Sequence, residues 1–187
     1  MIREGNISFE FYGDSIQYDK TNFYRNHVEK CKGFINYEDG NDSREEGTKA
    51  VDILGLNKSP LYIIEIKDFR GYRIQNKARI KNSELAFEFS LKVKDTITGL
   101  YGAFRKHSEE LKVFHTYLFY NRNEPNPVRA ILLMEEDMPE NDFEAKKRIA
   151  LKKELVTKIE QQLGFLSLHI SILSISELNN LPNWKVA

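Results

Sequence analysis

Two short apolar segments joined by a four-residue turn constrain the fold of this chain more than any other feature. They are residues 51–56 and 61–67, and the turn between them carries the Ser-Pro pair Ser59-Pro60. Apolar side chains alternate onto both faces of each segment, so neither face can be left in water. We therefore expect a strand hairpin buried at the centre of an α/β protein.

Three charged residues interrupt this apolar hairpin. If Leu56 pairs with Leu61, then Asp52 falls opposite Glu65, and Lys67 shares the face of Glu65. Directly opposed residues lie about 5 Å apart at Cβ, where two like charges destabilise a strand pair. A divalent cation removes that penalty, and Mg²⁺ favours sites with one or two carboxylates, water and substrate phosphate. The alternative interpretation is a structural ion pair between Lys67 and one of the acids.

The order and spacing of these residues resemble a known family. Asp52, a twelve-residue gap and Glu65-Ile66-Lys67 look like the motif of the PD-(D/E)XK nuclease superfamily, whose fold is restriction-endonuclease-like. Val51 stands where that family often has proline. The resemblance implies that Asp52 and Glu65 bind Mg²⁺ or Mn²⁺, with the Ile66 carbonyl as a further metal ligand. It also implies that Lys67 is catalytic, by positioning or deprotonating water.

The resemblance further implies side chains from two helices. The family often supplies another acid from an upstream helix, and Glu29 is the candidate, with Glu45 and Glu46 as alternatives in a loop. A helix after the motif can present a Lys or Gln toward the metal, and Lys92 is one candidate among several lysines. The motif covers residues 49–68, and the order of elements extends the resemblance over most of the chain.

A basic run follows the motif. Residues 67–82 contain six basic residues and one acid, Asp68, with Phe69 and Tyr72 interleaved. Lysine and arginine neutralise nucleic-acid phosphates, so this run predicts a nucleic-acid-binding segment. The alternative is a solvent-exposed edge hairpin whose charges discourage aggregation. The predicted phosphate contacts are Arg70, Arg73, Lys77 and Lys81.

Composition sets the remaining bounds. The 187 residues, 41% of them hydrophobic, predict a single domain over 1–187. The 28 basic and 28 acidic residues give zero net charge, which excludes a strongly basic DNA-coating protein but not a local basic groove. One cysteine, Cys31, cannot form an internal disulfide, which favours a cytoplasmic location. The chain has no apolar signal stretch and no run of membrane-span length, so we expect no membrane partner.

Hydrophobic periodicity predicts the order of the remaining elements. Strands are expected at 6–12, 16–18, 128–134 and 166–172, the last an outer strand, and a polar loop at 38–48. Helices are expected at 20–32, 84–106, 108–120 and 143–163, with a short terminal helix from 176. A hairpin that is apolar on both faces needs helices on both sides. The expected fold is a restriction-endonuclease-like α/β sandwich with a central mixed β-sheet flanked by helices.

The expected function is that of a metal-dependent nuclease, a hydrolase of phosphodiester bonds, with DNA as the expected partner. The alternative is a non-catalytic nuclease-fold module that binds nucleic acid or protein, in a defence or repair complex. The sequence leaves open DNA against RNA, and a homodimer against a complex with another protein.

Overall fold

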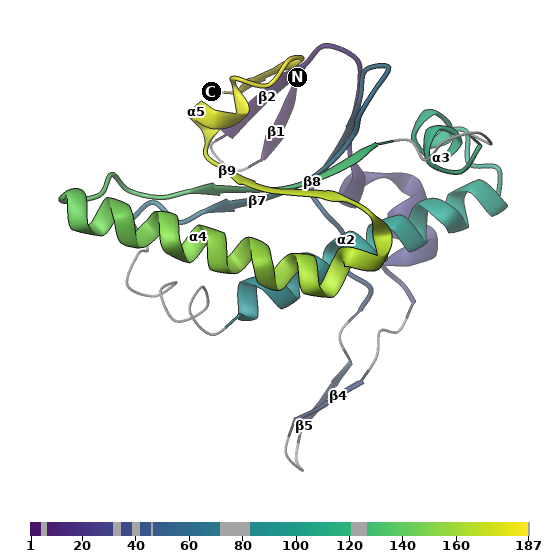
Figure 1. Ribbon diagram of the computed structural model, residues 1–187. Helices are drawn as coiled ribbons and strands as arrows, with labels where there is room; N and C mark the ends of the chain where they lie inside the picture. The colour runs from purple at the N-terminus through teal and green to yellow at the C-terminus, as the bar shows by residue number, and fades with distance from the viewer. Residues whose placement is uncertain are drawn as a thin grey trace.

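A five-stranded mixed sheet forms the centre of the protein (Figure 1). The computed structural model describes residues 1–4, 7–31, 35–38, 42–45, 47–71, 83–120 and 127–186, with the backbone alone described in 35–38 and 42–45. The strands, in their order across the sheet, are β3 (Asp14–Gln17), β6 (Ile53–Leu56), β7 (Leu61–Asp68), β8 (Val128–Glu135) and β9 (His169–Leu173). β6 runs antiparallel to both of its neighbours, whereas β7, β8 and β9 are parallel.

The predicted hairpin and its register are confirmed. Leu56 pairs with Leu61, and Leu54 pairs with Ile63. All four residues of β6 are buried, as are the first five residues of β7. This burial on both faces is what the apolar composition of the two segments predicts. β9 lies at an edge of the sheet, as expected of an outer strand.

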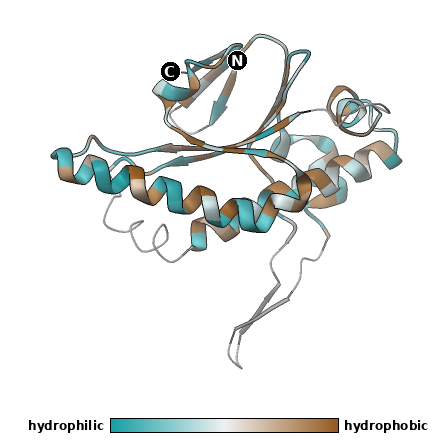
Figure 2. Cartoon of the chain, viewed as in Figure 1, coloured by the Kyte–Doolittle hydropathy of each residue, from teal (hydrophilic) through white to brown (hydrophobic). Residues whose placement is uncertain are grey.

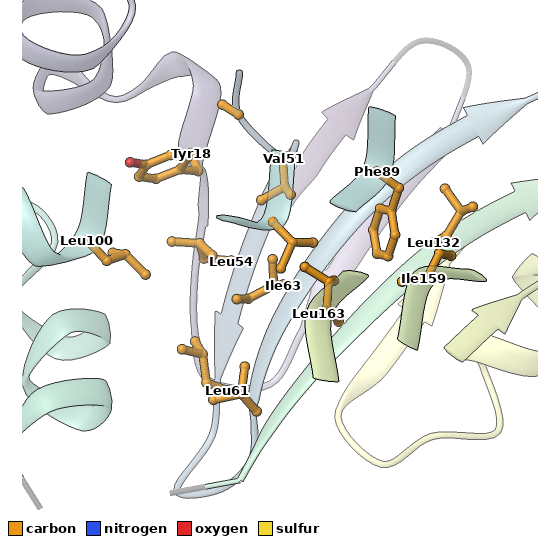
Figure 3. Close-up of a cluster of buried hydrophobic side chains, with 14 of the residues drawn as sticks. Tyr18, Val51, Leu54, Leu61, Ile63, Phe89, Leu100, Leu132, Ile159 and Leu163 are labelled. Atoms are coloured by element: carbon orange, nitrogen blue, oxygen red, sulfur yellow. The ribbon is translucent and has the colours of Figure 1, made fainter. Parts of the chain in front are cut away.

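Helices α2 (Glu84–Arg105) and α4 (Asp142–Leu163) cover one face of the sheet (Figure 1). The shorter helix α3 (Lys112–Phe119) packs against α2, β6 and β7 in the same hydrophobic cluster. Leu85, Phe89, Val93 and Leu100 recur at helical spacing along α2 and are buried. Together with side chains from β6, β7, β8 and α4 they form the larger of two hydrophobic clusters (Figure 3). This cluster fixes α2 directly over the strands that carry the motif.

A small sheet, rather than long helices, covers most of the opposite face. β2 (Ile7–Phe11) pairs antiparallel with β1 (Ile2–Glu4) and β10 (Trp184–Val186), and the one-turn helix α5 (Ile175–Leu178) packs beside them. The expectation of helices on both sides is therefore only partly correct. Apolar residues of β2 and β10 replace helical side chains against β6, β7 and β8. β1 and β10 have three residues each, so their sequences are too short to show the alternation typical of a strand.

The helix expected at 20–32 is confirmed only in part. A 3₁₀ turn, η1 (Tyr18–Lys20), comes first, and residues 22–28 are helical, most of them in the π-helical turn η2 (Tyr24–Val28). The backbone N–H groups of Asn22 and Phe23 donate to the Glu110 carboxylate, a partner 88 and 87 residues away. This long-range cap holds the start of the helical segment, and no local sequence pattern shows it.

The bounds of other helices and strands differ from the expected ones by a few residues. Part of the expected loop at 38–48 pairs as β4 (Ile35–Glu38) with β5 (Asp42–Glu45). The 3₁₀ turn η3 (Gly164–Leu166) takes up the start of the strand expected at 166–172. α4 begins behind an Asn141 side chain that accepts a hydrogen bond from the Glu144 N–H. Among the described residues, no helix is both long and apolar enough to cross a membrane.

Candidate active site

Backbone hydrogen bonds hold Asp52 between η1 and β7, one residue before β6 begins. Its N–H donates to the Ile64 carbonyl (3.1 Å), and its own carbonyl accepts from the Tyr18 N–H (2.9 Å). The Tyr18 bond continues the β3–β6 pairing, whereas the Ile64 bond departs from the β6–β7 ladder, in which Ile64 already faces Ile53. The Asp52 side chain therefore turns toward β7, where its Oδ2 accepts a 2.7 Å hydrogen bond from the Ile66 N–H.

The environment of Asp52 opposes ionisation. Burial is the largest cause, and the nearby Glu65 charge adds to it, so the pKa of Asp52 is raised to about 7. Lys92 and the Ile66 N–H act in the opposite direction and offset part of this shift. The carboxyl is consequently poised between its neutral and charged forms near neutral pH.

Glu65 is the most buried charged residue of the site, with 1% of its surface exposed. One carboxylate oxygen, Oε1, lies 2.6 Å from Nζ of Lys92 and 3.1 Å from Nζ of Lys67. The other oxygen, Oε2, is buried and has no hydrogen-bond partner among the described residues. An unsatisfied buried carboxylate oxygen is costly, so this atom marks a place where a cation or a donor is expected.

Lys67 bridges two carboxylates. Its Nζ lies 2.7 Å from Glu88 Oε1 and 3.1 Å from Glu65 Oε1, and its side chain is 19% exposed. Burial lowers the pKa of Lys67, but the charges and hydrogen bonds of Glu65 and Glu88 outweigh it, so the pKa is raised above its ordinary value. Lys67 is therefore an ammonium at neutral pH.

Helix α2 contributes two side chains to the site. Glu88 and Lys92 are one turn apart, which places both on the helix face above β7. Among the lysines available for the family's helix position, Lys92 contacts Glu65. Glu88 was missed by sequence reasoning, although its i, i+4 spacing to Lys92 was a usable signal.

The oxygen atoms of the site fit a magnesium or manganese ion that takes only a few of its ligands from the protein. Asp52 and Glu65 supply two carboxylates, and Glu65 Oε2 is buried without a partner. A cation there would relieve both that oxygen and the mutual repulsion that raises the Asp52 pKa. In the part of the chain that the structure describes, no group of three or more His, Cys, Asp or Glu side chains is arranged to hold a metal ion. The role of the Ile66 carbonyl as a ligand stays a prediction.

Of the three expected upstream acids, only Glu29 can be placed. Glu29 is exposed at the end of η2, and the side chains of Glu45 and Glu46 are outside the described residues. The acids whose charges reach the site from upstream are Glu4, which acts on Asp52, and Asp19, which interacts with Lys92. Burial raises the pKa of Asp19, and its Oδ1 is buried without a partner among the described residues.

Of the predicted phosphate contacts, only Arg70 can be placed. Its guanidinium donates to both oxygens of Asp68, with Nε 2.8 Å from Oδ1 and Nη2 2.7 Å from Oδ2. This bidentate pair holds the charge of Arg70 against its own strand. Arg73, Lys77 and Lys81 lie outside the described residues.

Comparisons with known proteins leave the family of the chain open. No family model and no solved structure matches it. A cysteine–tRNA ligase of Neisseria meningitidis is 31% identical over 131 residues, which cover 60% of this chain and 18% of the ligase. The chain thus spans less than a fifth of the length of that curated relative.

Proposed function

We propose that this protein is a metal-dependent nuclease of restriction-endonuclease-like fold that hydrolyses phosphodiester bonds, with DNA as its substrate. The observation that carries the proposal is the clustering of Asp52, Glu65 and Lys67: Asp52 accepts from the Ile66 N–H between the other two residues, and Lys67 lies 3.1 Å from Glu65. A mixed sheet with helices over that face is also the arrangement that the motif's resemblance implies.

Each residue has a distinct role in the proposed chemistry. Asp52 and Glu65 would hold Mg²⁺ or Mn²⁺, which supplies Lewis-acid stabilisation of charge on the phosphoryl group. Because Lys67 is held as an ammonium by two carboxylates, we assign it to hydrogen bonding and charge stabilisation at the phosphate rather than to proton abstraction. Lys92 fixes Glu65 through Oε1 and leaves Oε2 as the oxygen directed to the metal.

The second candidate is a non-catalytic module that keeps the motif as an internal ion-pair network. The observation that favours it is that Glu65 Oε1 already accepts from two ammonium groups. In that case Lys67 and Lys92 would compensate the buried acids without any metal.

RNA is the alternative substrate. The curated relative is named as a ligase acting on tRNA, and the segment it shares with this chain covers 60% of the chain. A substrate screen therefore needs plasmid, linear, nicked and single-stranded DNA, together with folded and single-stranded RNA.

Calorimetric titration with Mg²⁺ and Mn²⁺ separates the two candidates. We expect wild type to bind metal and both Asp52→Asn and Glu65→Gln to lose binding while staying folded. Asp68→Asn is the matched control, because Asp68 lies on the same strand but pairs with Arg70 outside the site. Metal binding by both site variants at wild-type affinity would make the carboxylates structural.

Cleavage assays then test the chemistry. Lys67→Ala should slow cleavage by about two to three orders of magnitude, as expected for loss of one transition-state contact, with little change in metal affinity. Cleavage by this variant at the wild-type rate would remove Lys67 from the mechanism. Metal binding without cleavage of any substrate in the screen would favour the non-catalytic module.

A further inference from the structure

The N-terminal half of α4 carries a concentration of positive charge that the site described above does not use. Residues 145–153 contain five basic residues and no acid, in a chain with no net charge. The buried residues of α4 are Leu155, Ile159 and Leu163, all in its C-terminal half. Its N-terminal half is consequently more open to solvent, and much of the helix is hydrophilic (Figure 2).

Three of these five cations are available to a partner. Lys146, Lys147 and Lys153 are exposed, and their ammonium groups have no ion pair or hydrogen bond within the described residues. At 100° per residue they fall on one side of the helix, opposite the side that packs on the sheet. The other two cations are held internally: Arg148 pairs with Glu144, and Lys152 lies 3.9 Å from Glu177.

The N-terminal end of α4 lies at the same edge of the sheet as the candidate active site. Lys67 pairs in parallel register with Met134, near the end of the strand that leads into α4. The Asp137 carboxylate accepts from the Gly71 N–H at 3.0 and 3.2 Å, and Arg148 of α4 donates to the Asp137 carbonyl. These contacts tie the start of α4 to the residues that directly follow the motif strand.

We propose that Lys146, Lys147 and Lys153, the α4 lysine face, bind the phosphate backbone of a DNA duplex whose scissile bond enters the candidate active site. The proposal rests on the proposed function. Charge complementarity carries it: a neutral protein that binds a polyanion needs a local positive surface beside the reaction centre. Arg70, which the sequence predicted to contact phosphate, is already neutralised by Asp68.

Acidic residues beside the face define where the duplex can lie. Six acids occur in residues 135–144, immediately before the lysines. Within the protein, Glu135 accepts from the Ile175 N–H, Asp137 accepts from the Gly71 N–H, and Glu144 pairs with Arg148. Repulsion from Glu136 and Asp142 directs the phosphates toward the outward side of α4 from Lys146 onward.

The test is fluorescence anisotropy with a 20-base-pair duplex in EDTA, where binding is measured without metal or cleavage. The variant is Lys146→Gln/Lys147→Gln/Lys153→Gln, since glutamine keeps helix propensity and the three side chains have no partners to lose. The matched control is Lys30→Gln/Lys58→Gln/Lys106→Gln, three exposed lysines outside α4. Far-ultraviolet circular dichroism of both variants checks the fold.

We expect the α4 variant to bind duplex at least tenfold more weakly at 50 mM salt, with the slope of log K against log salt reduced by about 2 to 3. The control variant should stay within about twofold of wild type. An α4 variant with wild-type affinity and slope overturns the inference. So does loss of binding to phosphatidylserine vesicles while duplex binding is unchanged, which would assign the face to a lipid surface.

The same measurement separates this inference from the proposed function. Asp52→Asn should bind the duplex like wild type, because it removes no α4 lysine. If wild type binds through the α4 lysine face but cleaves nothing, the inference stands and the nuclease proposal fails. If wild type cleaves and the α4 variant binds and cleaves equally well, the nuclease proposal stands and the inference fails.

Discussion

The ammonium of Lys92 lies 2.6 Å from Oε1 of Glu65 and connects helix α2 to the buried motif strand. Glu65 is 1% exposed, so its charge depends on partners within the protein. Lys67 provides a second contact at 3.1 Å, which means that loss of Lys92 leaves the carboxylate partly compensated.

Replacing Lys92 should therefore destabilise the fold without unfolding it. We expect Lys92→Met to lower the free energy of unfolding by about 1 to 3 kcal/mol, because a buried charge loses its shorter ion pair. Urea denaturation measures the loss. Lys94→Met is the control, since Lys94 is on the same helix but lies over the Phe165 ring, 5.8 Å from its centroid. Added Mg²⁺ should restore more stability to Lys92→Met than to wild type if the acids bind metal.

Asp52 should make stability fall as pH rises through the neutral range. Its pKa is raised from 3.8 to about 7 in the folded protein, so the native state holds a proton that the unfolded chain releases between those values. Raising the pH from 4 to 8 should cost wild type about 2 to 4 kcal/mol relative to Asp52→Asn, which cannot ionise. Denaturation curves of both proteins at each pH isolate this residue, and parallel curves would show that Asp52 ionises freely.

Gly99 should tolerate no side chain, because a Cβ at this position would collide with the Tyr18 hydroxyl. We expect Gly99→Ala to lose about 1 to 3 kcal/mol, although alanine favours helix. The Tyr18 hydroxyl is buried without a partner among the described residues, so Tyr18→Phe alone should be neutral or stabilising, and it should rescue Gly99→Ala. Gly102→Ala is the control, because its Cβ would meet Phe23 at an ordinary 3.7 Å. Equal thermal stability of the two alanine variants would contradict this account.

Asp68 should limit the contribution of Arg70 to nucleic-acid binding. Because the guanidinium is held bidentately by Asp68, Arg70→Gln should change duplex affinity by less than about twofold. Asp68→Asn should raise affinity at low salt, since it releases that cation. Anisotropy at 50 mM salt tests both variants, and a large loss in Arg70→Gln would show that Arg70 exchanges Asp68 for phosphate.

The motif hairpin could be predicted from sequence because its information is local. The turn sets the register of residues 53–56 against 61–64, and period-two alternation then puts Glu65 and Lys67 on one face. Asp52 lies one residue before that ladder and meets the strand through the Ile66 N–H instead. The helices α2 and α4 followed from apolar stripes of period 3.6.

The features that the sequence could not predict depend on contacts between segments far apart in the chain. Glu110 reaches back across 88 residues to cap Asn22 at the start of the helical segment 22–28. β10 pairs with β2 across nearly the whole chain, so three residues at one end had no local signature of a strand. Glu88 belongs to the site because of how α2 is rotated about its own axis where it packs on β7. The apolar stripe of α2 does not fix that rotation closely enough to show which polar residue faces Lys67.

The hairpin of β6 and β7 also sets the order in which the site is assembled. Its two acids are joined by a short turn, and hairpins of this size form within microseconds. Lys92, 27 residues from Glu65, arrives only when α2 docks, and the parallel pairing of β7 with β8 needs the later crossover. Before Lys92 is in place, the like charges of Asp52 and Glu65 therefore oppose each other with only Lys67, on the same strand as Glu65, to offset them. Folding should be fastest where Asp52 is protonated, or where a divalent cation is present from the start.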